Sequence, residues 1–115
     1  MKSLASILAL LILVSSCALN SNTTIKPNDS FILGNNEHDS FKVKLKNVSK
    51  NELEVYHAPL EGGRHSSQNV KPDESVTLKI ERNTALIIAN KSNDTASVDL
   101  KVTGDTGLSM GYKNR

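Results

Sequence analysis

The chain has 115 residues, which is enough for one domain and too few for two. Hydrophobic residues make up 37% of it and charged residues 23%, a balance typical of folded rather than disordered proteins. The formal net charge is +2 and charges of both signs are interspersed. The charge distribution therefore argues against a nucleic-acid-binding protein, which usually concentrates basic residues on one face.

The beginning of the chain has the pattern of an export signal. Lys2 precedes an apolar run over 4–14, which is too short for a membrane-spanning helix and has the length of a signal-peptide core. The small residues Ser15 and Ser16 then lead to Cys17, the single cysteine of the chain. The sequence V-S-S-C at 14–17 resembles the lipobox of bacterial lipoproteins.

This resemblance implies that residues 1–16 are a cleaved signal peptide and that Cys17 becomes the lipid-bearing first residue of the mature protein. One acyl chain anchors only marginally, whereas two or three hold a protein stably on a membrane. Ala18 stands where many Gram-negative bacteria use aspartate to retain lipoproteins in the inner membrane. The resemblance thus implies a protein attached through Cys17 to the outer membrane, and the lack of acidic residues just after it favours the periplasmic side.

Residues 17–30 are rich in Asn, Ser and Thr and contain Pro27. This composition predicts a lipidated flexible tether. The folded domain is then expected over 31–115.

From residue 31 onward apolar residues recur with a period of two, which is typical of strands with one face in a core. Seven strands are predicted, at 31–33, 41–46, 52–56, 76–81, 85–89, 96–102 and 108–112. The segment ALIIA at 85–89 is apolar throughout, as expected of a central strand covered on both faces. We therefore predict an all-β antiparallel β-sandwich of immunoglobulin-like architecture, with a small β-barrel as the alternative. On strand pattern alone, the mature part resembles small β-sandwich lipoproteins of unknown function.

The longest segment without alternation lies between the third and fourth predicted strands. It carries five candidate binding residues on what the pattern indicates is a surface loop: Tyr56, His57, Arg64, His65 and Gln68. Loops on rigid sandwiches often carry recognition, and Tyr and Arg are favoured anchors at interfaces. His57 and His65 also suggest an alternative, a metal-binding site, although their spacing fits no known zinc signature.

The sequence contains only weak matches to known catalytic motifs. Asp105-Thr106-Gly107 matches the tripeptide of aspartic proteases, but Thr103 and Gly104 stand where those enzymes have apolar residues, and the sequence also suits a turn. No nucleophile elbow and no phosphate-binding glycine loop occurs. We therefore expect a protein that is not an enzyme and that needs no cofactor.

Asp94-Thr95-Ala96 is similar to the periplasmic O-glycosylation site of one large Gram-negative phylum, so Thr95 is a candidate modification site.

Together these features predict a lipid-anchored protein of the cell envelope that acts as a non-catalytic binding or structural module. Its expected partner is another protein, in the manner of an inhibitor or immunity lipoprotein. A metal-dependent function through His57 and His65 remains the alternative.

Overall fold

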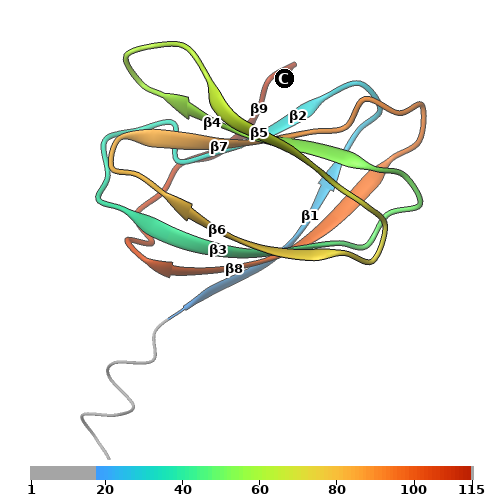
Figure 1. The fold of residues 1–115 in the computed structure, drawn as a ribbon, viewed down its shortest axis with the longest axis horizontal. Coiled ribbons are helices and arrows are strands. Elements are labelled where there is room, and N and C mark those ends of the chain that lie inside the picture. The colour runs from blue at the N-terminus through green and yellow to red at the C-terminus, as the bar shows by residue number, and fades with distance from the viewer. Residues whose placement is uncertain (1–17, 115) are drawn as a thin grey trace, which may run out of the picture.

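The computed structural model describes residues 18–114 and folds them into two antiparallel β-sheets that pack face to face (Figure 1). The nine strands are β1 (Leu19–Ile25), β2 (Ser30–Leu33), β3 (Phe41–Asn47), β4 (Leu53–Pro59), β5 (His65–Val70), β6 (Ser75–Ile80), β7 (Thr84–Ala89), β8 (Ala96–Gly104) and β9 (Met110–Tyr112). Residues 18–114 contain no helix long and apolar enough to cross a membrane.

The strand pairings are nested. One sheet has the order β1-β8-β3-β6 and the other the order β5-β4-β7-β2-β9, so β1 pairs with β8, β2 with β7, β3 with β6 and β4 with β5. A long hairpin rolled up on itself gives this pattern, which is the connectivity of a jelly roll. The predicted sandwich architecture is confirmed, with jelly-roll rather than immunoglobulin connectivity. The barrel alternative is wrong, because the two sheets stay separate.

The core fills the space between the sheets, as the alternation predicts. Along β3 the buried Phe41, Val43 and Leu45 alternate with exposed lysines. Strand β7 is buried at every position, which confirms that ALIIA is covered on both faces. Its Leu86 and Ile88 point into the core, while Ile87 points to the outer side of the five-stranded sheet.

Two of the nine strands lie where none was predicted. Leu19–Ile25 forms β1, which pairs along its whole length with β8, so the prediction of a flexible tether through residue 30 is wrong. The segment predicted as a binding loop is also largely extended. Tyr56 and His57 belong to β4, His65 and Gln68 belong to β5, and only 60–64 connect the two strands.

Candidate functional site

Three residues from neighbouring strands form an apolar row on the outer face of the five-stranded sheet. Ile32 on β2 lies directly opposite Ile87 on β7, which in turn lies opposite Tyr56 on β4. On the far side of Ile32 the partner residue on β9 is Gly111, and a side chain there would meet open space. The row is therefore left uncovered on its β9 side.

The connection between β4 and β5 places a cation over one end of this row. Gly62 and Gly63 both have positive φ, at 119° and 80°, which residues with a side chain rarely adopt. The chain thereby turns back so that the Arg64 guanidinium lies 4.7 Å from the centre of the Tyr56 ring. At this distance the cation is attracted to the face of the ring.

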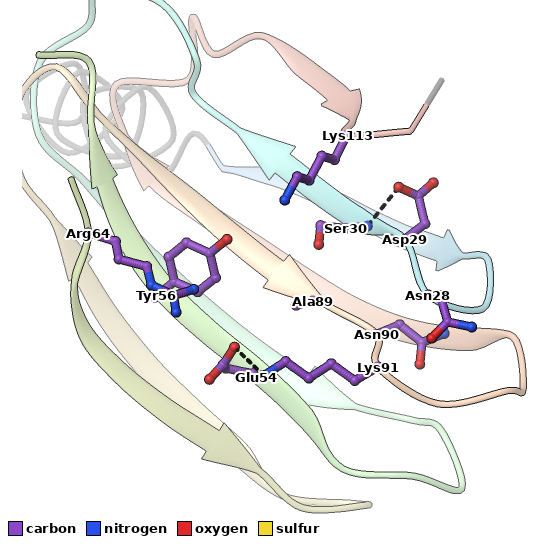
Figure 2. A pocket seen from close by; sticks show the side chains of 10 residues that line it. All are labelled: Asn28, Asp29, Ser30, Glu54, Tyr56, Arg64, Ala89, Asn90, Lys91 and Lys113. Carbon is purple, nitrogen blue, oxygen red and sulfur yellow. Dashed lines mark hydrogen bonds and ion pairs between the residues drawn. The ribbon is translucent and has the colours of Figure 1, made fainter. Parts of the chain in front are cut away.

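A pocket of about 450 Å³ opens above the apolar row; we call it the outer groove. Its lining comes from three strands, from the connection between β4 and β5 and from the segment after β9: Ile32, Tyr56, Ala58, Gly63, Arg64, Ile87 and Lys113. Figure 2 shows Arg64 alongside the Tyr56 ring and Lys113 reaching in from the opposite side. The groove thus combines an aliphatic floor with a cation on each flank.

A smaller polar pocket of about 200 Å³ continues from the groove and shares Tyr56, Arg64 and Lys113 with it. Here Lys91 Nζ lies 3.0 Å from Glu54 Oε1 (Figure 2). Ser67 Oγ also donates to Glu54 Oε2 at 3.1 Å. The Lys91 hydrogen bond, opposed by desolvation and helped by Ser67, holds the pKa of Glu54 below its ordinary value.

Of the three cations around the groove and the polar pocket, one forms an ion pair with a carboxylate of the described residues and two do not. Glu54 neutralises Lys91, whereas none of the ion pairs among residues 18–114 includes Arg64 or Lys113. Those two cations are therefore available to a negatively charged group in the groove.

The two histidines named from sequence lie elsewhere, on the neighbouring strands β4 and β5 of the same sheet. His57 points inward between the sheets, 7% exposed, and His65 lies opposite it on β5 with the ring centres 5.0 Å apart. Glu81, just after β6, completes the group: its Oε2 lies 2.9 Å from His57 Nδ1 and its Oε1 lies 3.7 Å from His65 Nε2. We call His57, His65 and Glu81 the histidine cluster.

Desolvation alone would raise the pKa of Glu81, but the hydrogen bond from His57 and the nearby imidazoles outweigh it and lower that pKa. The carboxylate is thus held in its charged form.

The five residues predicted as one binding loop therefore fall into three places. Tyr56 and Arg64 line the outer groove, and His57 and His65 belong to the histidine cluster on the other side of the sheet. Gln68 is exposed on the edge strand β5, opposite Val55, and lines neither site. Lys113 and Glu81 were not among the predicted residues.

Thr95 is exposed in the connection before β8, and its glycosylation stays a prediction. The predicted lipidation site Cys17 and the predicted signal peptide over 1–16 lie outside the described residues, so both stay predictions. In the Asp-Thr-Gly tripeptide, Asp105 accepts backbone N–H groups of Gly107 and Asp39, both at 2.8 Å, and these bonds lower its pKa. That carboxylate organises the loop between β8 and β9.

No family model matches the chain, and no curated protein matches it. Among solved structures, the chain is similar to a mitogen derived from Yersinia pseudotuberculosis, with 15% identity, a TM-score of 0.44, and coverage of 81% of this chain and 94% of that one. It is also similar to PirA, with 20% identity, a TM-score of 0.41, and coverage of 72% and 90%.

Proposed function

We propose that the protein is a lipid-anchored binding module of the bacterial cell envelope that recognises another protein through the outer groove. The observation that carries this proposal is the apolar row of Ile32, Ile87 and Tyr56 flanked by Arg64 and Lys113. Tyrosine and arginine are the residue types that most often dominate binding energy at interfaces. The groove presents apolar and cationic side chains for binding, and the proposed function requires no catalytic residue.

The chemistry of the groove defines the partner. Its floor accepts an aliphatic or aromatic side chain, because Ile32 is only half buried and, with Ile87, gives the groove an apolar base against which such a side chain can be removed from water. The cations on its flanks favour a carboxylate next to that apolar group, since an arginine can bind a carboxylate through two parallel hydrogen bonds. The proposed ligand is therefore a protein surface that presents an apolar side chain beside Asp, Glu or a chain terminus.

Reversing the charge at Arg64 is expected to weaken partner binding about tenfold or more. Arg64→Glu removes the cation over Tyr56 and places a carboxylate where the partner's own carboxylate would lie, and loss of an interface anchor commonly has an effect of this size. The measurement is crosslinking in intact cells from a photoreactive amino acid placed at Ala58, in the groove lining. A discrete adduct should form and should weaken strongly when Arg64→Glu is added.

Lys44 provides the matched control. It is exposed on β3, in the other sheet, and Lys44→Glu changes the net charge by the same amount. That variant should leave the adduct unchanged, and a photoreactive residue at Thr77 on the same face should give none. Equal adducts from both faces, or none from Ala58, would contradict the proposed groove.

The position of β1 supports an attachment close to the membrane. The strand begins at Leu19, two residues after Cys17. Two residues span at most about 7 Å when fully extended. A domain attached at Cys17 would therefore lie next to the lipid headgroups, and its partner would have to reach it there.

Cys17→Ala is expected to abolish incorporation of a labelled fatty acid and to release the protein from the membrane fraction. The reason is that only the thioether and amide-linked acyl chains at this residue would hold the protein there. Metabolic labelling followed by fractionation measures both effects. Ser15→Ala, which keeps a small residue before the cysteine, should retain both label and membrane association. A Cys17→Ala protein that still sediments with the membranes would show that the anchor is something else.

A further inference from the structure

We propose that the histidine cluster is a binding site for a late first-row transition metal ion such as Zn²⁺. Two imidazoles and one carboxylate are a common ligand set for zinc. In the cluster, one ligand atom from each of His57, His65 and Glu81 lies within 4.8 Å of the other two. The site is independent of the outer groove, because inward and outward residues of β4 point to opposite faces of the sheet.

The distances are close to those that a bound ion requires. Ligand atoms on one tetrahedral zinc lie about 3.3 to 3.6 Å apart, as follows from bonds of about 2.0 to 2.2 Å. The carboxylate of Glu81 is already 2.9 Å from His57 Nδ1 and 3.7 Å from His65 Nε2. The longest separation, up to 4.8 Å, must shorten by about 1.2 to 1.5 Å, which rotations of the two exposed side chains can supply. His57 is the buried, fixed member of the set.

A backbone irregularity is what brings the second histidine into place. The register between β4 and β5 pairs Val55 with Gln68, but two positions further along it pairs His57 with His65. A regular antiparallel pairing would place Ser66 opposite His57, so β5 carries one extra residue between His65 and Gln68, which is a β-bulge. Ser66 has a φ of 56°, a conformation that is uncommon for residues with a side chain. This bulge aligns the two imidazoles on the same face.

The orientation and accessibility of His65 also suit a ligand. Its Nδ1 lies 2.8 Å from Ser66 Oγ, which leaves Nε2 directed at Glu81. Hydrogen bonding of one ring nitrogen to fix the other is the usual arrangement at metal-binding histidines. His65 and Glu81 both line an open pocket of about 500 Å³, so an ion can enter from solvent.

The ligand set also defines the class of ion. Imidazole nitrogen suits Zn²⁺, Cu²⁺ and Ni²⁺, whereas Ca²⁺ and Mg²⁺ prefer sites made entirely of oxygen. The cluster is therefore expected to bind Zn²⁺ and not Ca²⁺.

Titration of the purified mature protein with Zn²⁺, followed by calorimetry, is the first test. One ion per chain should bind, and both His65→Ala and Glu81→Gln should weaken the affinity at least about tenfold, since even outer-shell changes at zinc sites have effects of 10- to 100-fold. Both side chains are exposed, at 45% and 54%, so neither substitution should disturb the fold. Glu52→Gln changes an exposed glutamate just before β4, away from the cluster, and this control should bind like the unaltered protein.

Imidazole NMR spectra supply a second readout within the same molecule. Addition of Zn²⁺ should shift the ring signals of His57 and His65. The third histidine, His38, should not respond, because its two ring nitrogens lie 2.6 and 2.8 Å from the backbone carbonyls of Asp39 and Thr84. No binding by the unaltered protein, equal binding by His65→Ala, or a response centred on His38 would each overturn the proposal.

Discussion

Replacing Ile88 by alanine is expected to lower the free energy of unfolding by about 2 to 5 kcal/mol, which is the usual range for truncating a buried aliphatic side chain to alanine. Ile88 is fully buried in β7, and its cross-strand partners are Phe31 on one side and Val55 on the other. Neighbours held on both sides by strand pairing cannot collapse far into the cavity that the substitution leaves. Equilibrium urea unfolding measures the change as a lower midpoint with an unaltered slope.

Ile32 is the matched control for this prediction. It has the same side chain and lies on the adjacent strand β2, but it points outward and is only half buried. Ile32→Ala removes fewer contacts and opens no enclosed cavity, so its effect should be well below that of Ile88→Ala. Equal losses would mean that the space between the sheets is not the main core.

Asn90→Ala is expected to destabilise the fold by about 2 to 5 kcal/mol, because it removes a set of hydrogen bonds made by a buried side chain, each contributing about 0.5 to 1.5 kcal/mol. Asn90 is 1% exposed. Its Nδ2 donates to the carbonyls of Ile25, Lys26 and Asp94 at 3.1, 3.2 and 2.8 Å. Its Oδ1 accepts from the backbone N–H and the hydroxyl of Ser92. One side chain thus joins the end of β1 to the connection between β7 and β8.

Urea unfolding measures this loss, and amide hydrogen exchange should locate it at the Ile25 end of β1. Asn22 offers a matched control, since it is exposed on β1 and, among residues 18–114, its side chain bonds to the side chains of Ser97 and Asp99. Asn22→Ala should change the stability by less than about 1 kcal/mol, as is usual for exposed polar contacts. An Asn90→Ala protein as stable as Asn22→Ala would show that the Asn90 hydrogen bonds do not hold this end of β1.

Alternation of apolar residues predicted the strands whose core-facing side chains are mostly apolar and missed the two, β1 and β5, whose side chains are mostly polar. In β5 only Val70 is buried, and in β1 only Thr23 and Ile25 are buried. Both are edge strands, held mainly by backbone pairing with a single neighbour. Backbone hydrogen bonds leave no trace in the side-chain pattern, so Asn- and Ser-rich sequence looks like a tether even when it is extended and paired.

Strand partners also could not be predicted. A period of two tells which face of a strand is buried, but it does not tell which strand lies beside it. The nested pairing of β1 with β8 and of β2 with β7 joins segments from opposite ends of the chain. For this reason the sandwich could be predicted while its jelly-roll connectivity could not.

Four of the five predicted binding residues do lie at the two candidate sites. Because the segment was interpreted as one loop, it could not be predicted that two of them belong to the outer groove and two to the histidine cluster. Once Tyr56 and His57 are recognised as consecutive residues of a strand, they must face opposite sides. Glu81 and Lys113 had no sequence signal at all. The fold brings Glu81 to His57 across 24 residues and brings Lys113 to the groove from the end of the chain.

The pairing of β1 has a mechanical consequence for an anchored protein. A partner that pulls on the domain would load the chain between Cys17 and Leu19, and the pull would run along the axis of β1. The hydrogen bonds that join β1 to β8 lie across that axis, so seven residue pairs from Leu19 to Ile25 would share the force in shear rather than open one after another. Strand β1, which its sequence predicts to be a flexible tether, would then be the strand whose hydrogen bonds to β8 keep the domain folded under tension.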